Sequence, residues 1–425
     1  MELSEHLFRR ESGRLVAALV RIFGVHNLAL AEDVVQDAFC RALDVWKIRG
    51  VPDNPSAWLM TVAKRRALDV VRRERTARTF APELTRWLES EWTLAPVVDE
   101  SFTSAVIRDE QLRMMFSCCH PSLPEEAQIA LILNVLCGFG ASEVATAFLT
   151  SRAAVEKRIT RGKKALANAE RLFDLSDDDF GARLASVRAA LYLLFNEGYH
   201  SASSETAVRA ELCDEAIRLT SMLLETEATA EPATFALAAL MCLHAARLPA
   251  RLDAHGDLSS LPDQDRSRWN RALIDRGLAL LEQASCGSVA TAYHLEAAIA
   301  AVHAGSPSIA STNWDAIVEL YDRLLKLTPS PVVALNRAVA VAQRDGPDAG
   351  LAAIRAIPDA DRLRDYPFYP AAIGELELRR GDAASAARAF AAAVGLARNP
   401  LERRFLERRL RTAETTSHPA PAGPA

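Results

Sequence analysis

Apolar residues recur at helical spacing along nearly the whole chain, and this pattern sets the class of fold. Strand-type alternation of apolar and polar residues is scarce, and Ala, Leu, Arg and Glu are abundant. Half of the 425 residues are hydrophobic and a quarter are charged, which is enough apolar surface to bury a sizeable core. Because this length exceeds what one core usually supports, we expect an all-α protein of two or three domains.

Two of the helical segments concentrate positive charge. Lys64–Arg78 and Arg152–Arg171 each contain seven Lys and Arg residues against two acidic residues. A helix that lies against DNA needs one face in its own core and another face on phosphates and base edges, and both segments have this pattern. The two segments therefore predict contacts with two separate DNA elements.

The net charge of −5 is unevenly distributed along the chain. Residues 1–171 contain 24 Lys and Arg against 22 Asp and Glu, whereas residues 172–425 contain 26 against 33. Counterion release depends on a dense local patch of cations and not on a basic protein. We expect the first part to bind DNA and the acidic second part not to bind nucleic acid.

The N-terminal block is expected to form three helices. Glu5–Ile22 and Ala29–Trp46 have helical periodicity, and the third helix starts at about Asn54, after a stretch with glycine and proline. Residues 79–108 are less periodic and form a predicted linker.

The second block is expected to contain a helix-turn-helix. A helix over Glu125–Cys137 is followed by Ser142, which we expect to N-cap a short helix ending at Leu149. Ser151 is then expected to N-cap the basic helix from Arg152. Two helices joined by a tight turn, the second of them basic, are typical of helix-turn-helix DNA binding.

From Phe180 onward the chain predicts alanine-rich amphipathic helices with a weak repeat. The pattern Arg337–Gly346 recurs 35 residues later as Ala372–Gly381, close to the tetratricopeptide (TPR) period of about 34 residues. The turn Asp345-Gly346-Pro347 joins two of these helices. We expect Gly346 to need a backbone conformation that other residues disfavour, and Pro347 to begin the next helix.

The motifs of the first 170 residues resemble those of bacterial RNA polymerase sigma factors. Ala31–Phe39, Trp46, and Pro55–Asp69 followed by Arg72-Arg73 resemble sigma region 2. The segment from Leu123 to Lys164 resembles region 4. No acidic N-terminal region and no middle domain accompany them, so the resemblance is to the extracytoplasmic-function (ECF) group.

The rest of the chain resembles the ECF subgroup with a long C-terminal TPR-like extension. Leu193–His200 and Asn336–Ala342, followed by Asp345-Gly346-Pro347, carry this resemblance. The expected domains are region 2 at 1–78, a linker at 79–108, region 4 at 109–173, the extension at 180–411, and a flexible tail at 412–425.

The resemblance implies that the second helix docks on the coiled coil of the polymerase β′ subunit. The expected core-binding residues are Asp33, Gln36, Asp37 and Phe39. Asp33, Gln36 and Asp37 lie at i, i+3 and i+4, so they offer polar partners on one side of the helix. Taken alone, the same pattern also fits a solvated acidic face.

For the −10 element, the resemblance implies that the loop Lys47–Pro55 holds a base flipped from the melted strand. The expected −10 contacts are Trp58, Lys64, Arg65, Arg66, Arg72 and Arg73. The cations are candidates for phosphate contacts, and Arg65 stands where the family commonly has Asn. Trp58 also fits a place in the domain core, because Leu59 and Val62 share its apolar side.

For the −35 element, the helix from Arg152 is the expected recognition helix. Its expected DNA contacts are Arg152, Glu156, Lys157, Arg158, Arg161 and Lys164. Early residues of such a helix reach base edges, Arg to guanine and Glu to the cytosine amino group, whereas Arg158, Lys163 and Lys164 fit backbone contacts better. Val155 and Ile159 are expected to face inward.

No pattern in the chain predicts catalysis, a metal site or a cofactor. Adjacent Cys118 and Cys119 do not easily place both sulfurs on one tetrahedral centre, so we expect them to be buried small hydrophobes. No nucleophile elbow accompanies His200, and no Walker loop, dinucleotide fingerprint or His-Glu-x-x-His occurs. The segment 196–200 fits either a ligand site or the end of a helix.

The function expected from this sequence is that of an alternative sigma factor and not an enzyme. Its expected partners are core RNA polymerase, through the β′ and β subunits, promoter DNA, and a protein that binds the TPR-like extension. Seven scattered cysteines and the absence of a signal-peptide core or long apolar run predict a cytoplasmic protein without a membrane span. A polymerase-independent helix-turn-helix regulator and an enzyme built on the C-terminal half are the alternatives.

Overall fold

A computed structural model shows an all-α protein. It describes residues 5–23, 27–74, 104–147, 150–168, 177–199, 209–287 and 289–417. Over these ranges the regular elements are helices, accompanied by one isolated β-bridge between Leu252 and Leu258. The all-α prediction is confirmed.

Contacts between residues divide the chain into two compact units. Unit 1 comprises residues 1–194 and 222–229, and unit 2 comprises residues 195–221 and 230–425. The division lies within two helices, α10 (Asp177–Tyr199) and α11 (Ala210–Leu224). The domain boundaries expected from the sequence remain a prediction.

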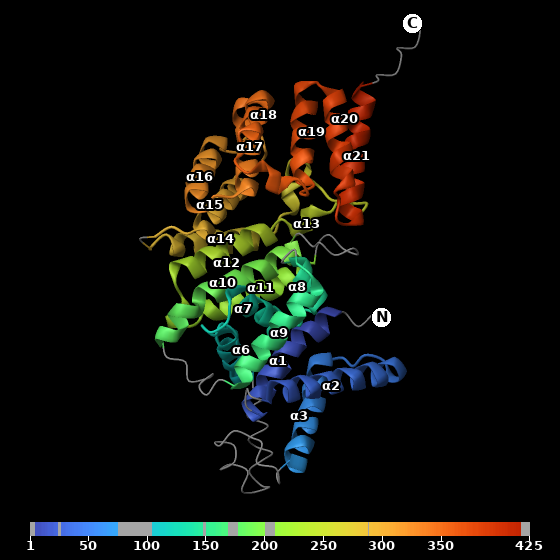
Figure 1. The fold of residues 1–425 in the computed structure, drawn as a ribbon, viewed down its shortest axis with the longest axis vertical. Helices are drawn as coiled ribbons and strands as arrows, with labels where there is room; N and C mark the ends of the chain where they lie inside the picture. Colours follow the sequence, from blue (N-terminus) through green and yellow to red (C-terminus); the bar gives the residue numbers. More distant parts are fainter. Residues whose placement is uncertain are drawn as a thin grey trace. The chain divides into compact units, whose positions relative to one another are not determined.

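Unit 1 contains the helices of both predicted DNA-binding blocks, shown from blue to green in Figure 1. Besides the first part of α10, its main elements are α1 (Glu5–Phe23), α2 (Leu28–Arg49), α3 (Pro55–Glu74), α6 (Ser104–Cys118), α7 (Glu125–Leu131), the π-helix η2 (Ile132–Leu136), α8 (Ala141–Ala147) and α9 (Arg152–Asn168).

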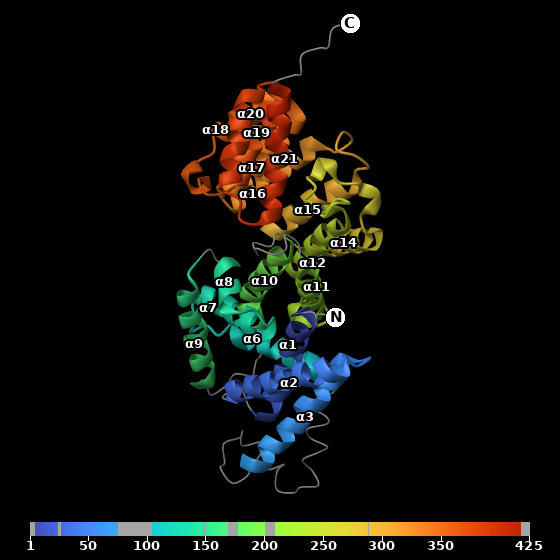
Figure 2. The same cartoon turned by 90° about the vertical axis from the view of Figure 1, so that its right-hand side faces the viewer.

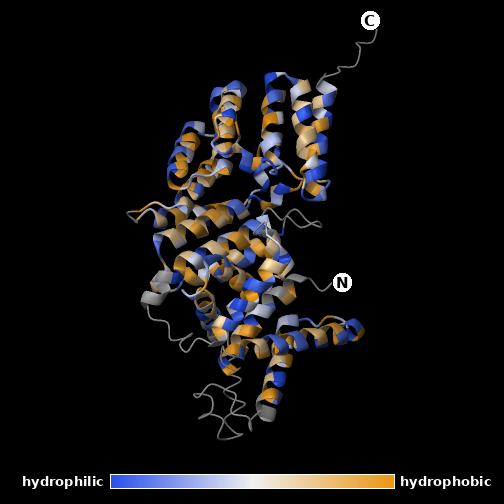
Figure 3. Cartoon of the chain, in the orientation of Figure 1, coloured by the Kyte–Doolittle hydropathy of each residue, from blue (hydrophilic) through white to orange (hydrophobic). Residues whose placement is uncertain are grey.

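The core of unit 1 is built around α1. Its apolar residues from Leu15 to Phe23 are almost completely buried, and α2, α3 and α6 pack against it. Apolar and polar residues alternate around most helices, as the hydropathy colours in Figure 3 show. Gly50 ends α2 with a φ of +81°, and the side chain of Asn54 caps α3 by accepting a hydrogen bond from the Ala57 amide at 3.0 Å.

Serine caps are expected at the N-termini of α8 and α9 in the second block. Ser142 lies inside α8 and does not cap it; instead, Glu143 accepts a hydrogen bond from the Gly140 amide at 2.9 Å. The expected cap at Ser142 is therefore wrong, because the helix begins one residue earlier. Ser151 does precede α9 and accepts a hydrogen bond from the Ala154 amide at 3.3 Å, as expected.

Unit 2 is a succession of helices that pack mainly on their neighbours in the sequence. Besides the end of α10 and most of α11, it contains α12 (Pro232–Ala245), α13 (Leu248–Arg251), η4 (Leu261–Asp263), η5 (Arg266–Arg268), α14 (Arg271–Ala284), α15 (Ala292–Gly305), α16 (Trp314–Leu327), α17 (Pro331–Asp345), α18 (Pro347–Arg355), η6 (Ala360–Leu363), α19 (Phe368–Arg380), α20 (Ala383–Gly395) and α21 (Pro400–Ser417).

The most apolar helix of unit 2 is α12. The stretch Pro232–Ala250 is long and apolar enough to cross a bilayer by length and composition, but 72% of it is buried inside the protein. A mostly buried core helix of this kind passes the same test, so the stretch is weak evidence for a membrane span. Gly277 of α14 packs closely on it, since a Cβ there would lie 2.8 Å from Leu243 Cγ.

The C-terminal repeat appears as successive helix pairs, α17 with α18 and α19 with α20 (Figure 2). Gly346 and Gly381 follow the first helix of each pair, with φ of +94° and +93°. Pro347 occupies the start of α18, as expected from the sequence. The helical nature of this part is confirmed, whereas its assignment to the TPR class remains a prediction.

Candidate nucleic-acid interface

The acidic residues of α2 face solvent, opposite the buried side of the helix. Asp33, Gln36 and Asp37 are exposed, whereas Val34, Val35 and Ala38 are buried. This gives α2 a polar face suited to a basic partner helix. Phe39 does not share this face: its half-buried ring meets the ring of Phe8 edge-on, with centroids 4.8 Å apart.

An ion pair links the acidic face of α2 to the basic side of α3. Arg66 Nε lies 2.8 Å from Asp37 Oδ2, and both side chains are well exposed. An exposed pair of this kind contributes about 0 to 1 kcal/mol, so a polymerase or DNA group can replace either partner at small cost. Arg65 is exposed and Lys64 is half-buried. Arg72 and Arg73 lie in α3, but their side chains are outside the described residues.

Trp58 belongs to an aromatic cluster beside the loop that precedes α3. Its ring meets that of buried Trp46 edge-on, with centroids 5.2 Å apart, and Trp46 stacks on Phe8 at 6.1 Å. Trp58 is half-buried, so part of its surface remains available. Both sequence interpretations of Trp58, in the core and beside the −10 loop, fit this position.

One residue near the loop was not singled out from the sequence. Ile48 is 86% exposed, at the C-terminal end of α2 between Lys47 and Arg49, and Val51 follows in the loop at 36%. An apolar side chain held in solvent beside two cations is suited to make an apolar contact with an unpaired base. The sequence does contain a sign that Ile48 is exposed, because helical spacing places it on the same side of α2 as Asp37 and Asp44.

Helix α9, the expected recognition helix, has the expected division into an inner and an outer face. Val155 and Ile159 are buried, as expected. The exposed residues are Arg152, Glu156, Lys157, Arg161 and Lys164. Gly162 allows the helix to approach Leu131 of α7, because a Cβ at this position would lie 2.6 Å from Leu131 Cδ1. This packing buries one side of α9 and leaves polar residues such as Arg152 and Lys157 exposed on the other side.

Two ion pairs modify the charge of α9. Arg152 Nε lies 2.7 Å from Glu156 Oε1 one turn later, and Arg158 pairs with Glu126 of α7. The Arg152–Glu156 pair is exposed, with side chains 70% and 49% accessible, so base edges can compete for both groups. Arg158 is half-buried and held by its partner, which fits a backbone contact better than base reading.

The region 2 and region 4 blocks are packed against each other within unit 1. Lys163 Nζ of α9 lies 2.6 Å from Glu32 Oε1 of α2, beside the acidic face. Helix α1 approaches η2 so closely that a Cβ at Gly13 would collide with the carbonyl oxygen of Leu136. We call this arrangement the closed form of unit 1.

The cysteine pair at the end of α6 is a core feature. Cys118 and Cys119 are buried, and burial raises the pKa of both thiols, that of Cys119 to about 12. Among the residues that the structure describes, no group of three His, Cys, Asp or Glu side chains is arranged to hold a metal ion. The expectation of buried small hydrophobes is confirmed.

In unit 2, the segment 195–199 ends α10 and packs tightly. Tyr199 is buried and stacks on Phe195, and its ring meets that of His244 edge-on at 5.1 Å. Gly198 lies against α11, since a Cβ there would be 2.8 Å from the Cys213 amide nitrogen. His200 is outside the described residues.

The predicted regulatory turn Asp345-Gly346-Pro347 joins α17 to α18. Asp345 forms a two-point ion pair with neighbouring Arg344, at 2.9 and 2.8 Å. This hydrogen bonding lowers the pKa of the Asp345 carboxyl. The three residues therefore shape the turn, and their regulatory role remains a prediction.

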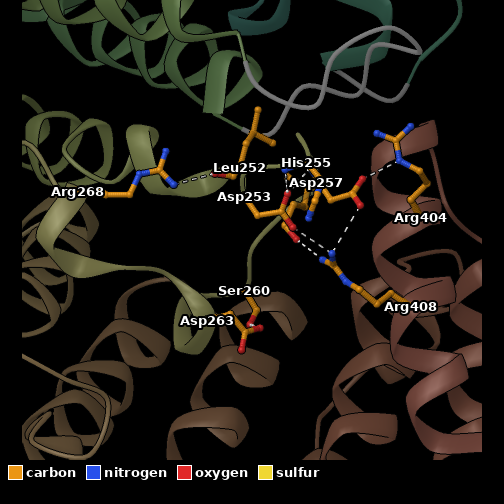
Figure 4. A network of polar contacts seen from close by, with 10 residues as sticks. Leu252, Asp253, His255, Asp257, Ser260, Asp263, Arg268, Arg404 and Arg408 are labelled. Atoms are coloured by element: carbon orange, nitrogen blue, oxygen red, sulfur yellow. Dashed lines mark hydrogen bonds and ion pairs between the residues drawn. The ribbon is translucent and has the colours of Figure 1, made fainter. Parts of the chain in front are cut away.

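Ion pairs also tie the loop after α13 to the last helix, α21, as Figure 4 shows. Arg404 Nε lies 2.7 Å from Asp257 Oδ1, and Arg408 Nη1 lies 3.2 Å from Asp253 Oδ2. Backbone amides of Asp257 and His255 also donate to Asp253, and these bonds lower the pKa of its carboxyl. The partners are about 150 residues apart, so no local sequence pattern predicts this network.

Comparisons with known proteins agree with the two blocks. A family model for sigma-70 region 2 matches residues 7–77, and one for sigma-70, region 4 matches residues 113–166. Residues 183–285 match a family of unknown function, DUF6596. No solved structure matches the chain.

Two curated relatives show how far the similarity extends. The Uncharacterized protein R00370 of Rhizobium meliloti (strain 1021) is 42% identical over 398 residues, which cover 93% of this chain and 92% of the relative. The ECF RNA polymerase sigma factor SigK of Mycobacterium sp. (strain KMS) is 28% identical over 169 residues, which cover 38% of this chain and 80% of the relative. The chain therefore belongs to the ECF-type RNA polymerase sigma factors, in a form with a helical C-terminal extension.

Proposed function

We propose that this sigma factor docks on core RNA polymerase through the exposed face of α2 and reads promoter DNA with α3 and α9. The observation that carries the proposal is the division of α9, with Val155 and Ile159 buried and Arg152, Glu156 and Lys157 exposed. The loop before α3 and the nearby Ile48 would receive unstacked −10 bases. The protein breaks no bond in DNA; binding energy stabilises the opened strands. A cytoplasmic location follows from these partners.

The closed form of unit 1 cannot engage both promoter elements at once. The −10 and −35 elements lie about 25 base pairs apart, or ~85 Å at 3.4 Å per base pair. In the closed form, α2 and α9 are joined by the Lys163–Glu32 ion pair at 2.6 Å. We infer that the two blocks separate when the protein joins core polymerase, which also uncovers Glu32 beside the docking face.

This opening predicts a distance change that fluorescence energy transfer can follow. Cys40 is an exposed native cysteine of α2 and takes the first label. Cys286→Ser removes the other exposed thiol among the described residues, and Thr160→Cys then places the second label on the exposed face of α9. The free protein should give efficient transfer. Addition of core polymerase and promoter should abolish it, because the separation grows by several tens of ångströms.

A second label pair controls for changes within region 2. Thr61 lies on the exposed side of α3, so Thr61→Cys provides a second labelling site within region 2. Labels on Cys40 and on this new cysteine should keep the same transfer efficiency before and after core polymerase and promoter are added. Unchanged transfer between α2 and α9 in an active holoenzyme would contradict the opening.

We further propose that the extension regulates the sigma half by protein contacts, through a partner of its helical pairs. Stacked helix pairs generate extended binding surfaces, and the net negative charge of residues 172–425 does not suit DNA. Truncation after Phe173 is a poor test, because Arg183 Nη1 donates to the buried Phe116 carbonyl at 3.1 Å within unit 1. Point substitutions inside unit 2 are cleaner.

Gly346→Val is expected to weaken the last helical pairs and to lower promoter-dependent transcription. A valine at φ +94° is strained by ~1–3 kcal/mol, although no atom lies within 4 Å of the added Cβ. The melting temperature of unit 2 should fall by roughly 2 to 10 °C. Run-off transcription measured below the melting range gives the functional effect.

Gly395→Val is the matched control. This residue ends α20 without a positive φ, and its Cβ would also meet open space. It should keep both stability and activity close to those of the parent protein. If Gly346→Val lowers the melting temperature and leaves transcription unchanged on all promoters, the extension does not regulate the sigma half through these pairs.

A further inference from the structure

Three arginines of unit 2 gather around two aromatic rings. Arg247 follows α12, Arg251 ends α13 and Arg266 begins η5. The guanidinium carbons of Arg247 and Arg266 lie 5.6 and 4.9 Å from the centre of the Trp269 ring, and that of Arg251 lies 4.3 Å from the Tyr199 ring. We call Arg247, Arg251 and Arg266 the arginine cluster.

No negative charge balances the arginine cluster within the described part of the chain. None of its members forms an ion pair there, and the oxygen atoms that accept their hydrogen bonds are neutral. Burial lowers the pKa of Arg247, and the like charge of Arg251 lowers it further. Burial and then the charge of Arg247 lower the pKa of Arg266. Partial burial of several cations without a counter-charge is unfavourable, so an anion that supplies the counter-charge would stabilise this cluster.

Four buried nitrogens around the arginine cluster have no hydrogen-bond partner. They are Arg251 Nε, Arg266 Nη2, Trp269 Nε1 and His303 Nδ1. The side chains of Trp269 and His303 belong to residues only 6% and 9% exposed. Burial, followed by the charges of Arg247 and Arg266, lowers the pKa of His303 to about 4, so its ring is neutral at pH 7. Three of the four nitrogens can only donate hydrogen bonds. A ligand that accepts hydrogen bonds would satisfy them.

We propose that the arginine cluster binds a small molecule through a carboxylate or phosphate group. Guanidinium groups match both oxyanions by paired hydrogen bonds, and bonds to a charged acceptor are about twice as strong as neutral ones. The partnerless nitrogens are shielded from solvent while the three arginines are only half-buried, which suits a small ligand better than a DNA strand. All three arginines lie within residues 183–285, the segment that matches the family of unknown function.

The position of the site connects it to the end of unit 2. Arg251 leads into the loop whose Asp253 and Asp257 pair with Arg408 and Arg404 of α21 (Figure 4). The Arg251 carbonyl also accepts a hydrogen bond from the Ser259 amide at 2.9 Å, at the far end of that loop. A ligand that fixes Arg251 therefore acts on the element that holds the last helix.

Anion binding is testable on the full-length protein by thermal melting and calorimetry. Inorganic phosphate and succinate are titrated separately, with sodium chloride holding the ionic strength constant. At least one should raise the melting temperature of unit 2 saturably; a response to phosphate alone indicates a phosphate-bearing ligand, and a response to succinate indicates a carboxylate. Arg251→Gln should weaken binding roughly 10- to 100-fold. Arg271→Gln, an exposed arginine of α14 that pairs with Asp275, should leave it unchanged.

A second measurement places the ligand without relying on a variant that must fold. In nitrogen-15 spectra of the native protein, the Trp269 indole signal should move when the anion binds, because Arg247 and Arg266 lie over the Trp269 ring. The proposal is overturned if neither anion acts beyond chloride. It is also overturned if Arg251→Gln binds as tightly as the native protein and the Trp269 signal stays fixed, since the anion then sits elsewhere. Binding is read on the protein alone, so such a failure leaves the sigma-factor assignment untouched.

Discussion

Replacing both Asp33 and Asp37 by arginine is expected to abolish binding to core RNA polymerase. Both carboxylates are exposed one helical turn apart on α2, and reversing them sets like charges against a basic partner surface. Such juxtaposition costs several kcal/mol, so the affinity should fall at least about 100-fold. The fold should persist, because within the described part of the chain the substitutions break only the exposed Asp37–Arg66 ion pair.

The measurement is a binding titration with purified core polymerase, accompanied by thermal melting. The matched control reverses two exposed carboxylates of α14, Asp275 and Glu282, of which Asp275 likewise belongs to an exposed ion pair with Arg271. The control should bind normally. Normal binding by the α2 variant would show that α2 is not the docking helix.

Substitutions on the outer face of α9 are expected to separate base reading from phosphate binding. Arg152→Ala and Glu156→Ala should each change tolerance at particular −35 base pairs by ~1–3 kcal/mol. The two side chains are paired at 2.7 Å, so each orients the other before DNA binds. The double substitution should therefore not equal the sum of the two single effects.

Lys164→Ala is the matched comparison for those two variants. Lys164 is exposed on α9 and is expected to contact a phosphate. Its replacement by alanine should therefore weaken binding to all promoters similarly and lower the slope of log affinity against log salt concentration by about 1. Binding titrations on a panel of −35 sequences at several salt concentrations measure both effects. If all three variants weaken every sequence equally, the division of α9 into base and phosphate contacts is wrong.

Local features of this fold were predictable from the sequence because each is set by neighbouring residues. Ser151 accepts the amide hydrogen bond expected of an N-cap, and Gly346 has the positive φ that a turn before Pro347 requires. Val155 and Ile159 are buried because helical spacing places them together on one side. Ser142 does not cap α8, because the helix already begins at Ala141 and the carboxylate of Glu143 accepts the hydrogen bond from the Gly140 amide.

Contacts between distant helices were not predictable in the same way. Lys163 and Glu32 are 131 residues apart, and the sequence alone favours a DNA backbone contact for Lys163. Arg408 and Asp253 are 155 residues apart, and the arginine cluster joins Arg247 and Arg251, around α13, to Arg266 of η5. Helical periodicity identifies which face of a helix is buried, but it does not identify the helix that covers that face.

The most direct test of the central claim is initiation by purified core polymerase on a library of promoter fragments, followed by sequencing of the transcript 5′ ends. Core polymerase with this protein should produce transcripts from defined start sites that share a −10 and a −35 element, and core polymerase alone should not. The Asp33→Arg, Asp37→Arg variant should fail to restore them. Duplex promoter binding by the protein alone, without any start-site-specific transcript from core polymerase, would contradict the account and favour a polymerase-independent helix-turn-helix regulator.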